Sequence, residues 1–306
     1  MRRSAPFRSL VLLASFGLLV AACGDDDDTA SSGEPTATTE ADGSTDTTGG
    51  EPSGSTAECD AELVEDGTLT IGTDTPAFPP WFVDDDPTNG EGYESAVAYA
   101  VAGELGFSED QVSWTVVPFN NAFAPGPKDF DFVINQVSIT EERDEAIDFS
   151  VGYSDVNQAM VGFEDSAAAS ATSLEDLKGL KLGAQQGTTS LDFILEEIDP
   201  DEDPFVYNDN SAAKAALDAQ QVDAIVLDLP TAFYVSAVEI EGTAVIGQFP
   251  SADDETEQFG MVFEDGNPLR DCVDEALASL DEAGELEAIE QEWLSDVVDA
   301  PVIELE

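Results

Sequence analysis

The sequence predicts an α/β protein, in which helices cover the faces of sheets. Along residues 59–306, short apolar runs alternate with longer segments of helical periodicity, a pattern typical of layered α/β folds. Apolar residues make up 42% of the chain, so a sizeable core can form although the net charge is −58. The length of this body suits one large domain or two moderate ones.

The first half of the body contains three predicted strands and a helix. The apolar run at residues 69–73 predicts a buried strand, and similar runs at 112–118 and 130–134 predict two more. The Ala and Val spacing of residues 93–105 predicts a helix that stops at Gly106.

The second half continues the alternation without an internal repeat. Residues 181–184 predict a short strand that leads into Gly187-Thr188-Thr189, where Thr suits the start of a helix. The remaining predicted elements are a helix at 212–219, a buried strand at 222–227 and amphipathic helices at 269–280 and 286–294.

The N-terminus has the pattern of an export signal. Three Arg residues precede an apolar run at 10–22, which is shorter than the roughly 20 residues of a membrane span and suits a signal peptide. The run ends Leu19-Val20-Ala21-Ala22-Cys23, which resembles a bacterial lipobox. The resemblance implies a signal peptide over 1–22, cleavage before Cys23 and lipidation of Cys23. The alternative is a secreted protein cut at an Ala-x-Ala site, with Cys23 left over.

Residues 23–58 form a predicted tether. From residue 24 to residue 57 they are nearly all Gly, Asp, Glu, Ser, Thr, Pro and Ala, so burial cannot offset the entropy of ordering. The acidic run at 25–28 could be interpreted as a metal site, but such runs are usually solvated charge. We expect a flexible, self-repelling linker, no metal and no cofactor.

The charge of the body excludes one class of function. Only six of the nine Lys and Arg residues follow residue 58, against 57 Asp and Glu residues, so we expect no nucleic-acid partner. Apolar runs recur throughout the body. The acidity therefore indicates a solvated acidic surface over an ordinary core, as in proteins from saline settings.

Two cysteines remain in the body, Cys59 near its start and Cys272 near its end. Outside the cytosol, two otherwise unpaired cysteines usually form a disulfide. This bridge would close a loop of more than 200 residues and contribute at most about 5 kcal/mol of stability. The bridge would also place both ends of the body in the same lobe, that is, in the same half of the folded chain. Two buried free thiols are the alternative.

Four polar residues each come shortly after a predicted strand. Asp74, Ser138, Thr188 and Asp228 follow the strands predicted at 69–73, 130–134, 181–184 and 222–227, respectively. Open α/β sheets bind ligands outside the carboxyl ends of their strands. The sequence therefore predicts one ligand cleft at which these side chains meet.

Arg143 is one of only two Arg residues in the body, the other being Arg270. A guanidinium group matches a carboxylate in two parallel hydrogen bonds, which Lys cannot copy. Arg143 is therefore a candidate ligand for an anion. The alternative is a surface Arg that balances Glu141, Glu142 and Asp144.

Residues 132–150 resemble the V-S-I-T-x-x-R…V-D-F-S-x-P-Y pattern of bacterial extracellular solute-binding proteins of the polar-amino-acid family. Shorter matches, each weak alone, keep the family's order across 63–296: Gly67 to Asp74, Gly92-Tyr93-Glu94, Leu177 to Gly183, Gln186 to Thr189 and Gly284 to Trp293. The resemblance implies a two-lobed periplasmic-binding-protein (Venus-flytrap) fold. Each lobe would be a mixed sheet flanked by helices, with two crossover strands as the hinge.

The resemblance also implies how the chain divides between the lobes. The chain would leave lobe I near 154–160 and return near 258–263. Lobe I would then hold residues 59–156 and 262–306, and lobe II residues 157–261.

The same resemblance assigns roles in the cleft. Arg143 would grip the α-carboxylate of an amino acid, assisted by the helix start at Thr188 and Thr189, where exposed N–H groups attract anions. Asp228 would accept hydrogen bonds from the α-ammonium group. For the threonines and for Asp228, a purely helix-capping role is the alternative.

Further contacts are expected from the segment before Arg143. Ser138 and the backbone near Gln136 would add hydrogen bonds to the ligand. Many relatives carry Ser or Gly at the position of Gln136, so this wall of the pocket differs from theirs. Glu94 replaces the usual Asp of a Gly-Phe-Asp motif, and its role could be limited to capping or bracing a helix.

Aromatic residues could contact the ligand side chain. Phe78 stands where the family has an aromatic residue beside the ligand, and Phe78 and Phe119 could sandwich the side chain between them. Trp81 is a further, weaker candidate for contact with the ligand. The alternative for all three aromatic residues is packing in the core.

The resemblance implies a lipid-anchored, monomeric receptor on the outer face of the membrane that feeds an ABC importer. It would bind an amino acid or a similar zwitterion, with ectoine-like compatible solutes as an alternative ligand. Contacts made to both lobes exist only when the lobes are shut, so ligand binding would close the hinge. We expect the membrane permease to be a separate protein.

Three other classes of function compete with this one. An enzyme on the same scaffold, such as a dehydratase of prephenate-like acids or a lytic-transglycosylase relative, lacks support because the chain has no His and no Ser or Cys nucleophile has an evident base. A ligand-sensing module would need an output segment. An adhesion or structural lipoprotein would not need the clamp.

Overall fold

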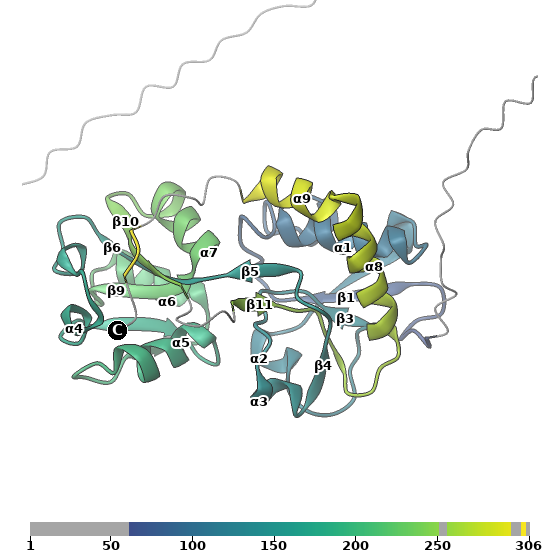
Figure 1. The fold of residues 1–306 in the computed structure, drawn as a ribbon, viewed down its shortest axis with the longest axis horizontal. Coiled ribbons are helices and arrows are strands. Elements are labelled where there is room, and N and C mark those ends of the chain that lie inside the picture. Colours follow the sequence, from purple (N-terminus) through teal and green to yellow (C-terminus); the bar gives the residue numbers. More distant parts are fainter. Residues whose placement is uncertain (1–60, 251–255, 295–300, 304–306) are drawn as a thin grey trace, which may run out of the picture. The chain divides into compact units, whose positions relative to one another are not determined.

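The computed structural model describes residues 61–250, 256–294 and 301–303. Their strands form two five-stranded sheets and a two-stranded ribbon (Figure 1). The predicted signal peptide, the predicted tether and the cysteines Cys23 and Cys59 lie outside the described residues.

The first sheet is mixed. In spatial order it contains β2 (Val112–Val116), β1 (Leu69–Thr73), β3 (Phe132–Val133), β12 (Val262–Glu264) and β4 (Ile147–Phe149). β1 is parallel to β2 and β3, whereas β12 is antiparallel to β3 and β4. Its helices are α1 (Tyr93–Glu104), α2 (Phe119–Ala122), α3 (Glu141–Asp144), α8 (Leu269–Ala283) and α9 (Glu285–Trp293).

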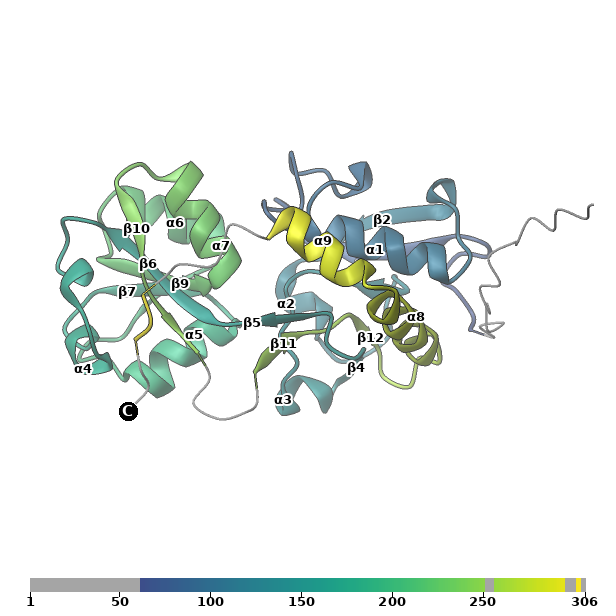
Figure 2. The same cartoon turned by 45° about the horizontal axis from the view of Figure 1, so that its top comes forward.

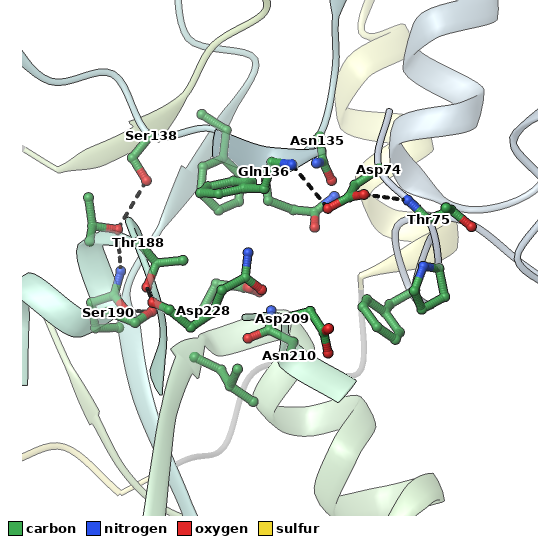
Figure 3. A pocket seen from close by; sticks show the side chains of 18 of the residues that line it. Asp74, Thr75, Asn135, Gln136, Ser138, Thr188, Ser190, Asp209, Asn210 and Asp228 are labelled. Atoms are coloured by element: carbon green, nitrogen blue, oxygen red, sulfur yellow. Dashed lines mark hydrogen bonds between the residues drawn. The ribbon is translucent and has the colours of Figure 1, made fainter. Parts of the chain in front are cut away.

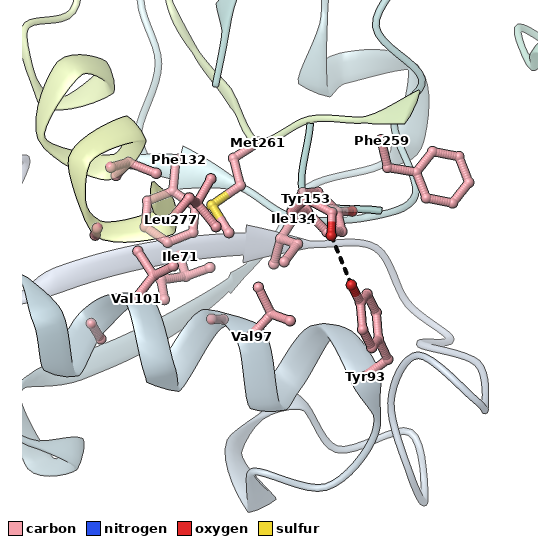
Figure 4. Packing of buried hydrophobic residues seen from close by; sticks show 14 of the residues in the cluster. Ile71, Tyr93, Val97, Val101, Phe132, Ile134, Tyr153, Phe259, Met261 and Leu277 are labelled. Atoms are coloured by element: carbon pink, nitrogen blue, oxygen red, sulfur yellow. Dashed lines mark hydrogen bonds between the residues drawn. The ribbon is translucent and has the colours of Figure 1, made fainter. Parts of the chain in front are cut away.

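Both faces of the first sheet are covered, because successive strand residues point to opposite faces. Phe132 packs with Val97 of α1 and Leu277 of α8 (Figure 4), whereas its neighbour Val133 packs with Ala122 of α2 on the other face. Each large side chain buried in this way contributes about 1.5–3 kcal/mol. Both faces of the first sheet therefore contribute to the core of this lobe.

The second sheet is also mixed. In spatial order it contains β10 (Thr243–Phe249), β6 (Gln158–Phe163), β9 (Ala224–Asp228), β7 (Leu182–Gln185) and β8 (Phe205–Tyr207). β7 is parallel to β8 and β9, whereas β6 is antiparallel to β9 and β10. Its helices are α4 (Leu174–Leu177), α5 (Thr189–Phe193), α6 (Asn210–Asp218) and α7 (Leu229–Tyr234), and π-helical turns at Ile194–Ile198 and Val235–Glu239 extend α5 and α7.

The second sheet repeats the two-sided packing. Met160 of β6 packs towards α4 and α5, whereas the adjacent Val161 packs towards α6 and α7. The two clusters share no residue with the core of the first sheet. The described chain therefore has two separate cores, as the predicted two-lobed α/β fold requires.

The two sheets are joined by the ribbon of β5 (Ser154–Val156) and β11 (Glu257–Phe259), which lie side by side in both views (Figures 1 and 2). The strands pair in antiparallel fashion, with Glu257 opposite Val156. The predicted pair of crossover strands is therefore present. The exact division of the chain between lobes, at 156/157 and 261/262, stays a prediction.

The C-terminal residues 301–303 differ from the prediction, which placed all of 262–306 in lobe I. Val302 forms a parallel bridge with Gln248 of β10, and Ile303 is buried in a cluster of the second sheet. The physical reason is a space at Gly247. A side chain there would begin only 2.5 Å from Cδ1 of Ile303, so the glycine makes room for the isoleucine.

Two further predictions concern membrane spanning and the disulfide. Among the described residues, none of the helices has the length and apolarity to cross a bilayer. Cys272 lies in α8 and packs against the core of the first sheet. Because Cys59 is outside the described residues, the pairing of these two cysteines stays a prediction.

Candidate functional site

A cavity of about 60 Å³ lies at the carboxyl ends of strands from both sheets (Figure 3). All eight predicted ligand-binding residues line it: Phe78, Phe119, Gln136, Ser138, Arg143, Thr188, Thr189 and Asp228. Figure 3 shows Asp209, Asn210 and Asp228 on one side of the hollow, with Asp74, Asn135 and Gln136 on the other. The structure therefore brings the predicted residues together, while their roles towards a ligand stay predictions.

Arg143 is buried, with 8% of its surface exposed. It lies in the single turn of α3, which begins where the Thr140 side chain accepts a hydrogen bond from the Arg143 backbone N–H. Within the described residues, no carboxylate lies within 4 Å of its guanidinium group, although four other ion pairs are present. Arg143 is therefore not a surface residue, although Glu142, one of the neighbouring acids, interacts with it electrostatically.

The guanidinium group of Arg143 joins the two lobes through carbonyl groups. Nη1 donates to the Ser138 carbonyl oxygen at 2.6 Å, and Nη2 donates to the Gly187 carbonyl oxygen at 2.9 Å. The group also lies over the ring of Phe123, 4.6 Å from its centroid, and near the ring of Phe119. Burial lowers the pKa of Arg143, while Asp192 and Glu257 oppose this change. The cation is thus held in place by neutral groups.

Asp228 occupies the end of β9 and also caps α7. Its Oδ1 accepts a hydrogen bond from the Thr231 backbone N–H at 2.8 Å. Burial raises its pKa to about 6, against the hydrogen bonds from Thr231, and the nearby charge of Glu257 acts in the same direction as burial. The helix-capping alternative is therefore correct, but the same carboxyl group also lines the cavity.

Thr188 caps the helix that begins at Thr189, as the sequence predicts. Its hydroxyl accepts from the Leu191 backbone N–H at 3.2 Å and donates to the Gln185 carbonyl oxygen at 2.8 Å. The preceding Gly187 has φ +77°, and a side chain there would begin 2.2 Å from Oδ1 of Asn120 in α2. The positive φ favours glycine at this position, and a larger residue would also have to displace the Asn120 side chain of the other lobe.

Gln136 is held in a conformation unusual for a residue with a side chain, with φ +46°. Its backbone N–H donates to Oε1 of Glu94 at 2.6 Å, and its side-chain amide donates to Oε2. Glu94 is fully buried and also accepts from the Tyr153 hydroxyl. Burial raises the pKa of Glu94 to about 7, although these hydrogen bonds lower it. Glu94 therefore braces the cavity wall at Gln136.

The aromatic residues divide between cavity and core. Phe78 and Phe119 both line the cavity, and the ammonium group of Lys214 lies 3.9 Å from the Phe78 ring centroid. Trp81 is fully buried in the core of the first sheet, and its Nε1 donates to the Thr231 hydroxyl at 2.8 Å. Trp81 therefore has the core role that was the alternative to ligand contact.

The comparisons with known proteins agree with the two-lobed fold. Residues 69–296 match the bacterial extracellular solute-binding proteins, family 3. The chain belongs to this family.

Known relatives of this solute-binding protein bind amino acids or amino-acid derivatives. The L-cystine-binding protein TcyJ of Escherichia coli (strain K12) is 28% identical over 235 residues, which cover 76% of this chain and 84% of that protein. An ancestral arginine-binding protein, solved with bound glutamine, is 29% identical, with a TM-score of 0.63 over 75% of this chain and 99% of that one. The ancestral amino acid-binding protein AncCDT-1, a precursor of cyclohexadienyl dehydratase, is 28% identical, with a TM-score of 0.62 over 74% of this chain and 95% of that one.

The structure of this solute-binding protein adds residues that the sequence analysis missed. Glu257 of β11 accepts hydrogen bonds from three side chains at the cavity, among them Gln158 of β6. Asp209 lines the cavity and caps α6. Asp209 follows β8, so the rule that ligands bind beyond strand ends could have found it, whereas no local pattern marks Glu257. Among the described residues, no group of three His, Cys, Asp or Glu could hold a metal ion.

Proposed function

We propose that the chain captures an amino acid or a similar zwitterion in this cavity and delivers it to an ABC importer. The observation that carries the proposal is the placement of two opposite charges. Arg143 comes from the first lobe and Asp228 from the second, and both line the same cavity. A ligand that carries a carboxylate and an ammonium group can therefore contact both lobes at once.

The carboxylate would bind beside Arg143. Two of its N–H groups donate to the carbonyl oxygens of Ser138 and Gly187, so the planar fork is oriented by the protein. A guanidinium group has five N–H donors, which leaves others for a ligand. The hydroxyls of Ser138 and Thr189 lie 3.2 Å apart and could donate to the same carboxylate.

The ammonium group would bind beside Asp228. Burial holds the pKa of this carboxyl group at about 6, which means that its charge lacks a sufficient partner. A ligand ammonium group would supply that partner and lower the pKa on binding. Asp74 and Asp209 also line the cavity, so ligands with a neutral or cationic side chain are favoured over acidic ones.

Contacts of this kind would couple binding to closure of the lobes. Arg143 and Gly187 touch across the lobes, as do Trp81 and Thr231. A ligand that touches both lobes binds the shut form more tightly than an open form, and this difference in affinity shifts the population. The shut form would then be recognised by a separate membrane permease.

The location of the protein is a further part of the proposal. The lipobox at residues 19–23 implies an anchor of lipidated Cys23 on the outer face of the cell membrane, with residues 24–58 as the tether. The receptor would act as a monomer. A disulfide between Cys59 and Cys272 would tie the start of the body to α8, in a compartment where disulfides persist.

A dehydratase is a second candidate, favoured by the similarity to AncCDT-1. The chain has no His, so an acid such as Glu94, whose pKa is raised to about 7 by burial, would have to transfer the proton. Incubation with prephenate-like acids tests this candidate, because a dehydratase would form product and a receptor would not.

A thermal-shift screen over the amino acids and compatible solutes tests the main proposal. A ligand that binds only the native state at 100 times its dissociation constant contributes about 2.7 kcal/mol of stability. For a domain of this size, that corresponds to a rise of about 5–10 °C in Tm. A screen in which no amino acid and no zwitterion raises the Tm would contradict the proposal.

A further inference from the structure

The carboxylate of Glu257 is bound by three side chains that converge at the cavity. Oε1 accepts a hydrogen bond from the Ser138 hydroxyl at 2.6 Å and another from the Thr189 hydroxyl at 2.6 Å. Oε2 accepts from Nε2 of Gln158 at 2.9 Å. Ser138 belongs to the first lobe, whereas Thr189 and Gln158 belong to α5 and β6 of the second. Three neutral donors from both lobes therefore surround one carboxylate.

These donors are oriented by buried neighbours. The hydroxyl of Ser190 donates to Oε1 of Gln158 at 2.6 Å, and both residues are buried. This hydrogen bond fixes the amide so that its N–H₂ group faces Glu257 and Thr189. A preformed set of hydroxyl and amide donors is what a carboxylate ligand requires.

The cation of the site stands beside the same donors. Ser138 presents its hydroxyl to Glu257 and its carbonyl oxygen to Arg143. Glu257 is close enough to interact electrostatically with Arg143, although the two do not form an ion pair within 4 Å. The side chain of Glu257 thus occupies the surroundings that the proposed function assigns to the ligand carboxylate.

Two carboxylates cannot share these donors. Like charges in contact repel strongly at the effective dielectric of a protein surface, and each donor proton bonds one acceptor well. Glu257 is only partly buried and stands at the end of β11, so its side chain can rotate towards solvent. A ligand carboxylate can therefore enter once Glu257 leaves.

We propose that Glu257 is an internal competitor that fills the carboxylate subsite of the ligand-free protein and is displaced by the ligand. This inference rests on the proposed function. Glu257 would then lower the affinity for every carboxylate ligand, because the ligand must replace the three hydrogen bonds that Glu257 makes in the ligand-free protein. If Glu257 fills the subsite about 90% of the time, the apparent dissociation constant is raised about 10-fold.

The test with ligand compares wild type with Glu257→Ala and Glu257→Gln by calorimetry. The ligands are the best amino acid from the thermal-shift screen and the same amino acid with its α-carboxylate converted to an amide. Glu257→Ala is expected to bind the amino acid about 10-fold more tightly and to bind the amide no more tightly than wild type. Glu257→Gln, which keeps the shape and removes the charge, is expected to change in the same direction.

Weaker or unchanged binding of the amino acid by both variants would overturn the proposal, because Glu257 would then assist the ligand or leave it unaffected. Tighter binding of the amide as well would also overturn it, since the gain would not depend on the carboxylate. If no amino acid binds to wild type or to either variant, the proposed function itself fails.

A second test needs no identified ligand. Sodium acetate supplies a free carboxylate, which is expected to refill the subsite emptied in Glu257→Ala. The Tm of this variant should rise by about 3 °C between low and 100 mM acetate, relative to sodium chloride at equal ionic strength. Wild type should show no such difference, because its subsite is filled.

Asp176→Ala is the matched control for the acetate test. Asp176 is an exposed carboxylate that likewise accepts from a Ser and a Thr hydroxyl, those of Ser173 and Thr172. It lies in α4, away from the cavity. An equal acetate response of Glu257→Ala, Asp176→Ala and wild type would overturn the proposal.

Discussion

Nη2 of Arg143 donates a hydrogen bond to the carbonyl oxygen of Gly187 at 2.9 Å. The two residues belong to different lobes, Arg143 to α3 and Gly187 to the turn before α5. The side chain predicted to hold a ligand carboxylate therefore already spans the cleft in the described structure. Contacts that depend on the closed cleft, such as this one, are what a ligand would strengthen or replace.

Ligand affinity is expected to fall in acid. Asp228 must be ionised to accept an ammonium group, and burial raises its pKa to about 6. A ligand ammonium group favours the ionised form of Asp228, so below pH 6 the carboxyl group must lose its proton before the ligand can bind. The affinity should therefore be about 10-fold weaker at pH 5 than at pH 7.5. Calorimetry across this range measures the effect. Asp228→Asn should bind weakly at every pH, with a flatter profile.

The nearby acids provide the control for this pH dependence. Glu257 and Glu94 interact electrostatically with Asp228, so Glu94→Gln is titrated in parallel. A pH profile that stays steep in Asp228→Asn but is flat in Glu94→Gln would assign the dependence to Glu94 and contradict the role of Asp228.

Glu94 is expected to make stability depend on pH. Burial raises its pKa from 4.5 to about 7. Between these two pH values, Glu94 therefore keeps its proton in the folded state and has lost it in the unfolded state. Its contribution to stability is therefore present below about pH 4.5 and is lost as the pH rises to 7 and above. Glu94→Gln should show a smaller fall in Tm between pH 5 and pH 8 than wild type, whereas the exposed Glu91→Gln should follow wild type.

Salt is expected to stabilise the protein. The body has 57 acidic residues against six basic ones after residue 58, and screening relieves the repulsion among them. Thermal melts from low to molar sodium chloride should show a rising Tm. A flat or falling curve would mean that the acidic surface is not an adaptation to salt in this sense.

Membrane attachment is expected to depend on Cys23. The residue ends the lipobox-like segment, and lipidation of its sulfur would hold the protein on the membrane. Cys23→Ser should move the protein from the membrane fraction to the soluble fraction and abolish labelling by a fatty-acid analogue. Retention of the Cys23→Ser protein in the membrane fraction would contradict the anchor.

The strongly periodic elements could be predicted from the sequence. β1 begins and ends as expected, and α1 ends one residue before the predicted limit. The strand expected at 130–134 is reduced to Phe132–Val133, and just before its start the side chain of Asp131 accepts a hydrogen bond from the backbone N–H of Thr70. The strand expected at 112–118 ends at Val116, because Pro118 has no N–H to donate and instead begins α2.

The cavity could be predicted only in part. Residues at the ends of buried strands, such as Asp228 at the end of β9, were found because their strands have a clear apolar pattern. Asp209 was missed because β8 is a three-residue strand in which Phe205 and Val206 are exposed. Glu257 was missed because its partners Ser138 and Gln158 lie 119 and 99 residues away in sequence, and no local pattern predicts such a contact.

Calorimetry of Arg143→Ala, Arg143→Lys and Asp228→Ala, with the best ligand from the thermal-shift screen, measures directly whether Arg143 and Asp228 hold the ligand. Arg270→Ala is the control, because Arg270 lies in α8, is paired with Asp148 and Asp271, and does not line the cavity. Thermal melts without ligand confirm that each variant is folded.

Removal of one partner of a buried charge pair costs about 2–5 kcal/mol, so Arg143→Ala and Asp228→Ala are expected to bind the ligand about 30-fold to several thousand-fold more weakly than wild type. Arg143→Lys should lose much of the same affinity, because a point charge cannot replace the fork, and Arg270→Ala should bind like wild type. Binding by folded Arg143→Ala and Asp228→Ala within about threefold of wild type, under about 0.7 kcal/mol, would contradict the account.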